Sequence, residues 1–190
     1  MSVVVITPPA TPVVSVEEAK AHLRATDDDA YIASLVAAAT CTIDGPAGWL
    51  GRALVTQTLE WRGDDFRCRE IALPYPPISV VVNVKYDDAN GAEQTVPSGD
   101  YRLVGQPNQP RLVLAHGASW PSIRWHSEAV RIRYTAGYGA ADDVPAPIKH
   151  AILLMVGHFY ANREEVVIGS TAVEVPLAAR SLLSPFRIFG

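Results

Sequence analysis

Cysteine is scarce in this chain, and long apolar runs are missing. The two cysteines, Cys41 and Cys68, have no second cysteine or histidine at metal-ligand spacing, so we expect reduced thiols. No apolar segment approaches the ~20 residues of a membrane span. The apolar N-terminus lacks a basic region and is interrupted by Pro8, unlike a signal peptide. These absences predict a soluble, cytoplasmic chain, and its 190 residues can fold around an apolar core without a disulfide or metal.

An excess of positive charge is also missing. The formal net charge is −4 at pH 7, which provides no general attraction to nucleic acid or anionic lipid. Arginines are spread through the middle of the chain, but acidic residues are interspersed with them. We therefore expect solvated strand faces and salt bridges between subunits rather than a nucleic-acid patch. The arginines in question are Arg62, Arg67, Arg69, Arg124, Arg131 and Arg133.

Motifs for catalysis are missing as well. His150 and His158 are eight residues apart, too far for a pair of metal ligands on one helix. The Gly137–Gly139 segment lacks the remaining glycines or lysine of a phosphate-binding loop. No serine lies in a nucleophile-elbow pattern. We therefore predict no catalytic, cofactor-binding or metal-binding residues, no cofactor and no enzymatic activity.

Two helices are predicted near the N-terminus. Ser15 and Glu18 form a capping-box pattern that begins a short first helix. Asp27, Asp28 and Asp29 begin the second, where acidic side chains oppose the positive end of the helix dipole. Gly45 and the proline after it end this helix. Helical spacing predicts one buried stripe, made of Ile32, Leu35, Val36, Ala39 and Ile43.

After the second helix the apolar period changes from helical to two. Val80, Val82, Val84 and Tyr86 alternate with Val81, Asn83 and Lys85, and Asn90 and Gly91 are typical of a hairpin turn. Helical spacing returns beyond Pro147, and the third helix is expected to end near Asn162. Its apolar stripe is Ile148, Ile152, Met155, Val156 and Phe159.

These patterns predict an α+β fold with a small helical core of three main helices. An antiparallel β-sheet or barrel-like insertion lies between the second and third helices, and an extended C-terminal tail follows. We predict an extended N-terminal arm at 1–14, a helical core at 15–50 and 142–163, a β insertion at 51–141, and a C-terminal tail at 164–190.

The C-terminal tail concentrates apolar side chains in its last residues. Burying each large apolar side chain is worth ~1.5–3 kcal/mol, so the tail is expected to be covered. It could dock on a partner protein by strand addition or groove insertion. The alternative is that it packs on its own helices. The residues are Leu182, Leu183, Pro185, Phe186, Ile188 and Phe189.

The order of several short motifs resembles the head–tail connector (adaptor) proteins of tailed phages, including the adaptor of gene transfer agents. The resemblance extends from Ser15 to Phe189. Each motif alone is weak, but their order and spacing are more specific. The motifs are the capping box, the acidic helix start, Gly51–Thr58, Leu73–Ile78, Val84–Tyr86, Trp120 with Pro121, Val130–Gly139, Pro145–Lys149 and Gly157–Glu164.

This resemblance implies a structural virion protein that forms a homo-oligomeric ring of about twelve copies. It implies a ring that binds the portal protein through the C-terminal tail and receives a tail-proximal head-closure (stopper) protein on the other side. DNA would pass through the channel without sequence-specific binding, and no cofactor, metal or membrane is implied. The expected location is the head–tail joint of a phage or phage-like particle, with assembly in the bacterial cytoplasm.

Basic channel walls would hold passing DNA, so the ring is expected to present acids to its channel or rim. Asp27, Asp28 and Asp29 are the candidates. Two other functions stay open from the residues alone. One is a different connector ring, a head-closure or tail-terminator protein, although those are commonly all-β. The other is a nucleic-acid-binding module or a small hydrolase.

Overall fold

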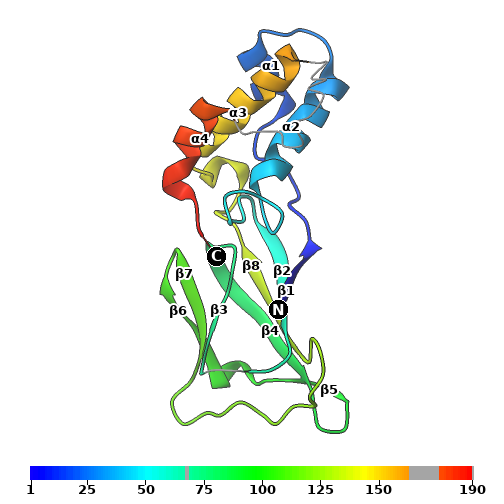
Figure 1. Ribbon diagram of the computed structural model, residues 1–190, viewed down its shortest axis with the longest axis vertical. Helices are drawn as coiled ribbons and strands as arrows, with labels where there is room; N and C mark the ends of the chain where they lie inside the picture. The colour runs from blue at the N-terminus through cyan, green and yellow to red at the C-terminus, as the bar shows by residue number, and fades with distance from the viewer. Residues whose placement is uncertain (67–68, 163–175, 190) are drawn as a thin grey trace, which may run out of the picture.

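The computed structural model describes residues 1–66, 69–162 and 176–189. This part of the chain forms an elongated molecule with helices at one end and antiparallel sheets at the other (Figure 1). The helices are α1 (Val16–Leu23), α2 (Asp29–Ile43), α3 (Ala146–Ala161) and α4 (Leu177–Leu183). The strands are β1 (Ser2–Thr7), β2 (Gln57–Gly63), β3 (Glu70–Ala72), β4 (Ile78–Asp87), β5 (Glu93–Thr95), β6 (Tyr101–Gln106), β7 (Gln109–Leu114) and β8 (Val130–Ala136).

Helix α1 begins with the predicted capping box. The Glu18 amide donates to Ser15 Oγ at 3.1 Å, and the Ser15 amide donates to Glu18 Oε2 at 2.8 Å. Two amides that would otherwise lack a helical partner are thereby satisfied. The helix ends at Arg24, which adopts the left-handed conformation with a φ of 55°.

Helix α2 has the predicted buried stripe, but of the three acids predicted to begin it only Asp29 lies in its first turn. Asp28 is the N-cap residue with a φ of 70°, and its side chain accepts no hydrogen bond from a helix amide. The tyrosine hydroxyl of Tyr160 instead donates to Asp28 Oδ2 at 3.2 Å, which ties the start of α2 to α3. Of the predicted stripe, Leu35 is only partly buried, while the other four members are buried.

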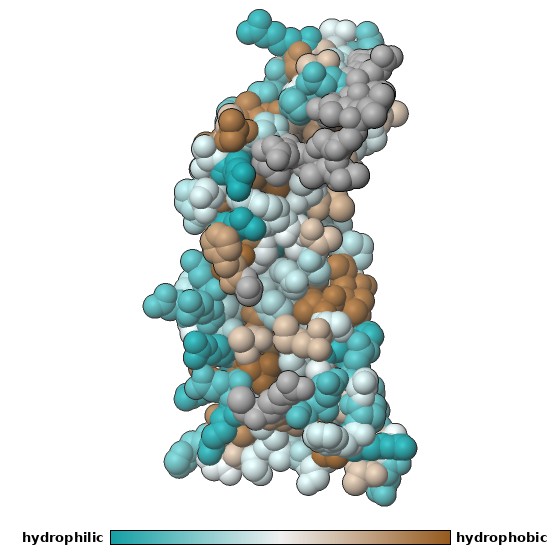
Figure 2. Space-filling view, in the orientation of Figure 1, coloured by the Kyte–Doolittle hydropathy of each residue, from teal (hydrophilic) through white to brown (hydrophobic). Residues whose placement is uncertain are grey.

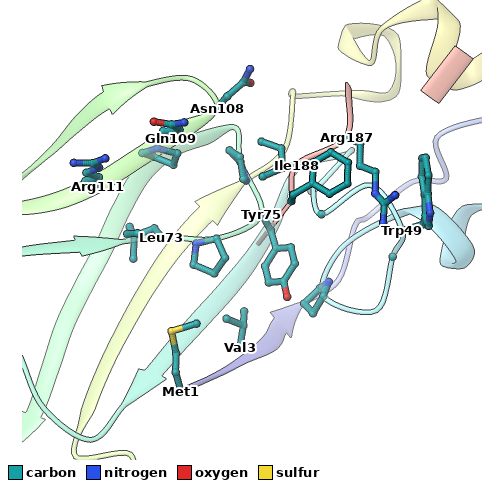
Figure 3. A pocket seen from close by; sticks show the side chains of 18 of the residues that line it. Met1, Val3, Trp49, Leu73, Tyr75, Asn108, Gln109, Arg111, Arg187 and Ile188 are labelled. Atoms are coloured by element: carbon teal, nitrogen blue, oxygen red, sulfur yellow. The ribbon is translucent and has the colours of Figure 1, made fainter. Parts of the chain in front are cut away.

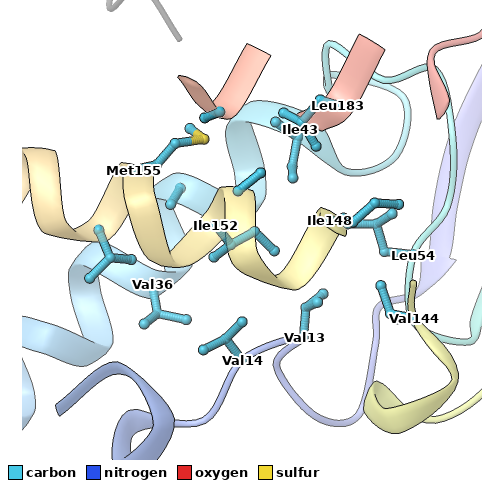
Figure 4. Close-up of a cluster of buried hydrophobic side chains, with 14 of the residues drawn as sticks. Val13, Val14, Val36, Ile43, Leu54, Val144, Ile148, Ile152, Met155 and Leu183 are labelled. Atoms are coloured by element: carbon cyan, nitrogen blue, oxygen red, sulfur yellow. The ribbon is translucent and has the colours of Figure 1, made fainter. Parts of the chain in front are cut away.

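The helical end of the molecule encloses its own apolar core. Helix α3 contributes most of it, α1 and α2 pack against α3, and α4 covers another side (Figure 4). Residues from outside the helices complete this core, since Val13, Val14 and Leu54 are also buried in it. The segment before α1 and the segment after α2 are therefore fixed to the helices by burial.

The larger sheet has the strand order β1-β2-β8-β4-β5, with every neighbouring pair antiparallel. Strand β1 pairs with β2 in a register that places Val3 opposite Trp61 and Val5 opposite Leu59. The region predicted as an extended arm thus contains a sheet strand. A run of β-branched residues, Val3 to Ile6, explains why this segment pairs.

The smaller sheet has the order β3-β7-β6 and packs on the larger one around a second apolar core. Leu59 and Ile132 enter this core from the larger sheet, and Ile71 and Leu112 enter it from the smaller one. Strands β2 to β8 all lie between α2 and α3. The predicted fold class, α+β with an antiparallel insertion, is therefore confirmed.

Parts of some predictions lie outside the described residues. These are position 163 of the predicted helical core, positions 164–175 and Gly190 of the predicted tail, and the residues Arg67 and Cys68. The division of the chain into arm, core, insertion and tail stays a prediction.

Candidate interaction surfaces

The C-terminal segment folds back onto the helical core. Leu183 is fully buried there, and Leu182 and Phe186 pack against the same core while partly exposed. Leu183 and the buried Ala179 lie four residues apart, on one face of α4, and this face contacts α3. Three of the six predicted portal-contacting residues, Leu182, Leu183 and Phe186, thus pack on the chain's own helices.

A buried arginine holds the end of the tail. Arg52 is only 4% exposed, and its Nε donates to the carbonyl of Phe186. Its other nitrogen, Nη2, donates to Asn108 Oδ1 at 2.8 Å, in the turn between β6 and β7. The amide of Ile188 donates to the carbonyl of Leu50 at 2.9 Å. The tail, the loop after α2 and the smaller sheet thus meet at one point.

Beyond this point the tail becomes exposed beside an open groove of about 960 Å³ (Figure 3). The guanidinium of Arg187 lies between two aromatic rings, 4.1 Å from the ring centre of Trp49 and 4.6 Å from that of Phe189. Phe189 is nevertheless 78% exposed, and Pro185 is exposed too. Of the predicted tail residues, these two remain most available to a partner protein.

The acids at the start of α2 are all exposed, at the helical end of the molecule (Figure 1). Asp29 Oδ1 forms an ion pair with Lys20 Nζ at 2.5 Å, and Asp27 accepts a hydrogen bond from the Thr26 hydroxyl. Their exposure satisfies the first requirement for acids at a channel wall or rim. The lining of a channel stays a prediction.

One face of the larger sheet carries an ordered set of ion pairs. Glu60 on β2 accepts from Arg62 at 2.9 Å and from Arg133 on β8 at 2.8 Å, and its side chain is only 5% exposed. Burial works to raise the pKa of the Glu60 carboxyl, but hydrogen bonds from Arg133 and Arg62 outweigh it and hold the pKa below 4.5. Glu60 is therefore ionised near neutral pH.

The same face continues toward the other edge of the sheet. Arg131 Nη2 lies 2.6 Å from Asp87 Oδ1 and 3.2 Å from Glu93 Oε2, and Lys85 pairs with Glu93 at 2.6 Å. The hydrogen bond from Arg131 is the main reason that the pKa of Asp87 is lowered. We predicted that such arginines form salt bridges between subunits. Arg62, Arg131 and Arg133 pair within the chain, because β2, β8 and β4 are neighbours, and salt bridges between subunits stay a prediction.

A partly buried acid, Asp44, lies where α2 meets the sheet. Asp44 Oδ1 accepts from the Leu54 amide at 2.8 Å, and Gln57 Nε2 lies 3.3 Å from both of its carboxylate oxygens. Burial raises the pKa of the Asp44 carboxyl above 3.8. These bonds connect the helical core with the first strand of the insertion, a structural role.

The described residues contain no group of three or more histidine, cysteine or acidic side chains placed to hold a metal ion. Tertiary packing does bring His22 of α1 and His150 of α3 together, with ring centres 6.0 Å apart in an edge-to-face arrangement. His158 is not part of this pair, and Cys41 is an exposed free thiol. None of the described helices is long and apolar enough to cross a membrane.

The sequence analysis did not predict two features, strand β1 and the position of Arg187 between two aromatic rings. The valine run of β1 was a usable signal for a strand. The placement of Arg187 between Trp49 and Phe189 had no local signal, because Trp49 is far from the tail in sequence.

Comparison with known proteins gives a consistent picture. No protein-family model matches the chain, and no curated protein sequence matches it. Solved structures of gene transfer agent (GTA) particles do match, over 100% of this chain and 97% of theirs. A chain from the neck of an empty GTA particle, computed with C6 symmetry, has a TM-score of 0.80 at 26% identity. A chain from the virion of a native GTA particle has a TM-score of 0.80 at 27% identity.

A chain from the neck of the native GTA particle, computed with C12 symmetry, shows the same fold with a TM-score of 0.72 at 24% identity. Full-length agreement with particle components, including a neck chain, supports a structural rather than an enzymatic role. It confirms the resemblance that the sequence motifs predicted: the chain is a connector-type structural protein of the neck of phage-like particles.

Proposed function

We propose that this chain is the adaptor subunit of the head–tail joint, and that it forms a ring of twelve copies between the portal and the tail-proximal stopper protein. The observation that carries this proposal is the match over the whole chain to a GTA neck component. The C6 and C12 symmetries of the matching necks support a closed ring. DNA passes through the ring without sequence-specific contacts.

The C-terminal tail is the proposed contact with the portal. Its first half is anchored in the helical core through Leu183, so the exposed end is held at a defined place. Phe189 presents an apolar ring, and Arg187 beside it presents a charge that the aromatic rings partly cover. Phenylalanine and arginine are both enriched at protein–protein interfaces relative to the rest of the protein surface.

Deletion of the coding region in particle-producing cells tests the function. We expect DNA-filled heads and separate tails, because an adaptor joins the two. Complementation with an epitope-tagged copy should restore joined particles, and electron microscopy with an antibody to the tag should label the neck. Joined particles that form without this chain would contradict the proposal.

A further inference from the structure

The larger sheet has two open edges. Strand β1 forms one end of it and pairs only with β2 among the described strands. At the other end, β5 pairs with β4 only through Lys85, Tyr86 and Asp87. The first part of β4, Ile78–Asn83, therefore pairs with β8 on one side and has no described strand on the other.

Both open edges, β1 and the first part of β4, are apolar and carry no charge and no proline, although the register of β1 shifts between Val5 and Thr7 and that of β4 shifts between Ile78 and Val80 and between Val81 and Asn83. Natural edge strands carry lysines, prolines or inward charges that prevent pairing with another chain. Strand β1 has no charged residue and no proline, and Val4, Val5 and Ile6 are each about two-fifths exposed. Figure 2 shows hydrophobic side chains gathered beside β1. An edge of this kind is expected to be covered in the assembled state.

The open part of β4 has the same character. Its sequence from Ile78 to Asn83 contains no charge and no proline, and Val80 and Val82 are 52% and 50% exposed. Charged residues begin only at Lys85, where β5 already covers the strand. The exposed valines therefore lie in the same part of β4 that has no described strand beside it.

The two edges also fit each other in length and direction. Strand β1 has six residues, the number in Ile78–Asn83, so both extend over roughly 20 Å at ~3.3 Å per residue. Directions alternate along β1, β2, β8 and β4, so β1 and β4 are antiparallel within one chain. A copy rotated about an axis along the strands keeps its strand directions. Its β1 would therefore meet β4 of the first copy in the antiparallel orientation.

We propose that β1 of one copy adds to the open edge of β4 in the next copy, so that the larger sheets join into one continuous β-ring. This contact is heterologous, as a cyclic ring requires, because two different patches meet and every copy uses both. The inference rests on the ring proposed above. Backbone hydrogen bonds provide the affinity, and the valines of the two edges provide the apolar contact.

Cysteine cross-linking in assembled particles tests the contact. In a Cys41→Ser, Cys68→Ser background, we would combine Val4→Cys with Val80→Cys or with Val82→Cys, and oxidise isolated necks. Double variants should give a ladder of covalent oligomers on a non-reducing gel. Each single variant should give none, and necks containing a mixture of the two single variants should stop at dimers. This pattern distinguishes a head-to-tail contact from a two-fold one.

Charge substitutions provide a second readout that does not depend on disulfide geometry. Val4→Lys or Val80→Glu alone should reduce joined particles about tenfold, because each places a charge in the shared edge. The double variant should recover much of the yield, since the introduced ammonium and carboxylate groups would then meet across the interface. The melting temperatures of the purified variants should stay within about 2 °C of the parent, because both valines are partly exposed in the monomer.

The outcomes separate this inference from the function. Necks that contain a ring of this chain, yet show no cross-link with either β4 cysteine and tolerate Val4→Lys, would overturn the shared edge and leave the adaptor function standing. Necks without this chain would overturn both. A ladder together with charge rescue would establish the β1–β4 contact.

Discussion

The amide of Ile188 donates a hydrogen bond to the carbonyl of Leu50 across 2.9 Å. This bond fastens the C-terminal tail to the loop that leaves α2, next to the buried Arg52. It divides the tail into a part that belongs to the core of the chain and a short exposed end. The division determines which tail substitutions should affect folding and which should affect assembly.

Leu183→Ala should destabilise the monomer. Leu183 is fully buried in the helical core, and removing a leucine side chain from a core costs about 2–4 kcal/mol. Leu177→Ala, on the same helix, is the matched control, since Leu177 is 82% exposed and should change stability by less than about 0.5 kcal/mol. Urea unfolding of both variants measures the difference. Equal effects would mean that α4 does not dock as described.

Phe189→Ala should impair assembly without destabilising the monomer. The Phe189 ring is 78% exposed, so its loss should leave the melting temperature within about 2 °C of the parent. If the exposed end contacts the portal, heads should fail to acquire tails. Counting joined particles by electron microscopy checks this. Normal joining with this variant would remove Phe189 from the portal contact.

Gly51→Ala should release the end of the tail. Gly51 has a φ of 65°, and a Cβ there would lie 2.6 Å from the Ile188 carbonyl oxygen. Backbone strain together with this clash should lower stability by about 1–3 kcal/mol. Gly99→Ala is the control, because no atom lies within 4 Å of the Cβ position there. Faster proteolysis near the C-terminus in Gly51→Ala, but not in Gly99→Ala, would show the release directly.

Acid should destabilise the sheet through its ion pairs. The pKa values of Glu60, Asp87 and Glu93 are lowered in the folded state. The unfolded chain therefore binds more protons in this range, and the stability that these acids contribute is lost as the pH falls below about 4.5. Thermal unfolding between pH 7 and pH 3 should show this loss.

Glu60→Gln tests that explanation. The substitution should cost about 1–2 kcal/mol at pH 7, because two arginines lose a buried charged acceptor. It should also make the acid-induced loss of stability shallower. Asp44→Asn should make the acid-induced loss of stability steeper. Burial raises the pKa of Asp44, so its protonation at low pH favours the folded state, and the substitution removes this contribution. If stability falls with pH equally steeply in the parent and in both variants, Glu60 and Asp44 do not contribute to the pH dependence.

Substitution of the acids near α2 tests the predicted channel. Asp27→Lys should leave folding nearly unchanged, because Asp27 is exposed and precedes α2, whereas Asp29→Lys also loses the ion pair with Lys20 and places a positive charge in the first turn of α2, which should cost about 1 kcal/mol. If they face the DNA path, DNA release from particles should become slower, and more so at low salt. Release measured against ionic strength checks this. Loss of neck assembly with unchanged release kinetics would place the acids against a protein instead.

Local patterns of the sequence were sufficient for much of the fold. The capping box at Ser15, the apolar stripes of α2 and α3, and the period-two segment around Val84 each depend on neighbours within a few residues. Interactions at that range are encoded locally by spacing and side-chain type. The order of these elements led to the α+β class and to the resemblance with connector proteins.

Tertiary structure alone decided the partners of segments that are distant in sequence. The valine run of β1 could pair with any strand, and only the fold places it beside β2 at the edge of the sheet. The sequence predicts Leu183 and Phe189 alike as apolar residues of the tail, yet Leu183 is buried and Phe189 is exposed. Burial depends on what packs against a side chain, and here α3, which is distant in sequence, packs against the face of α4 that holds Leu183, whereas Phe189 lies beyond α4.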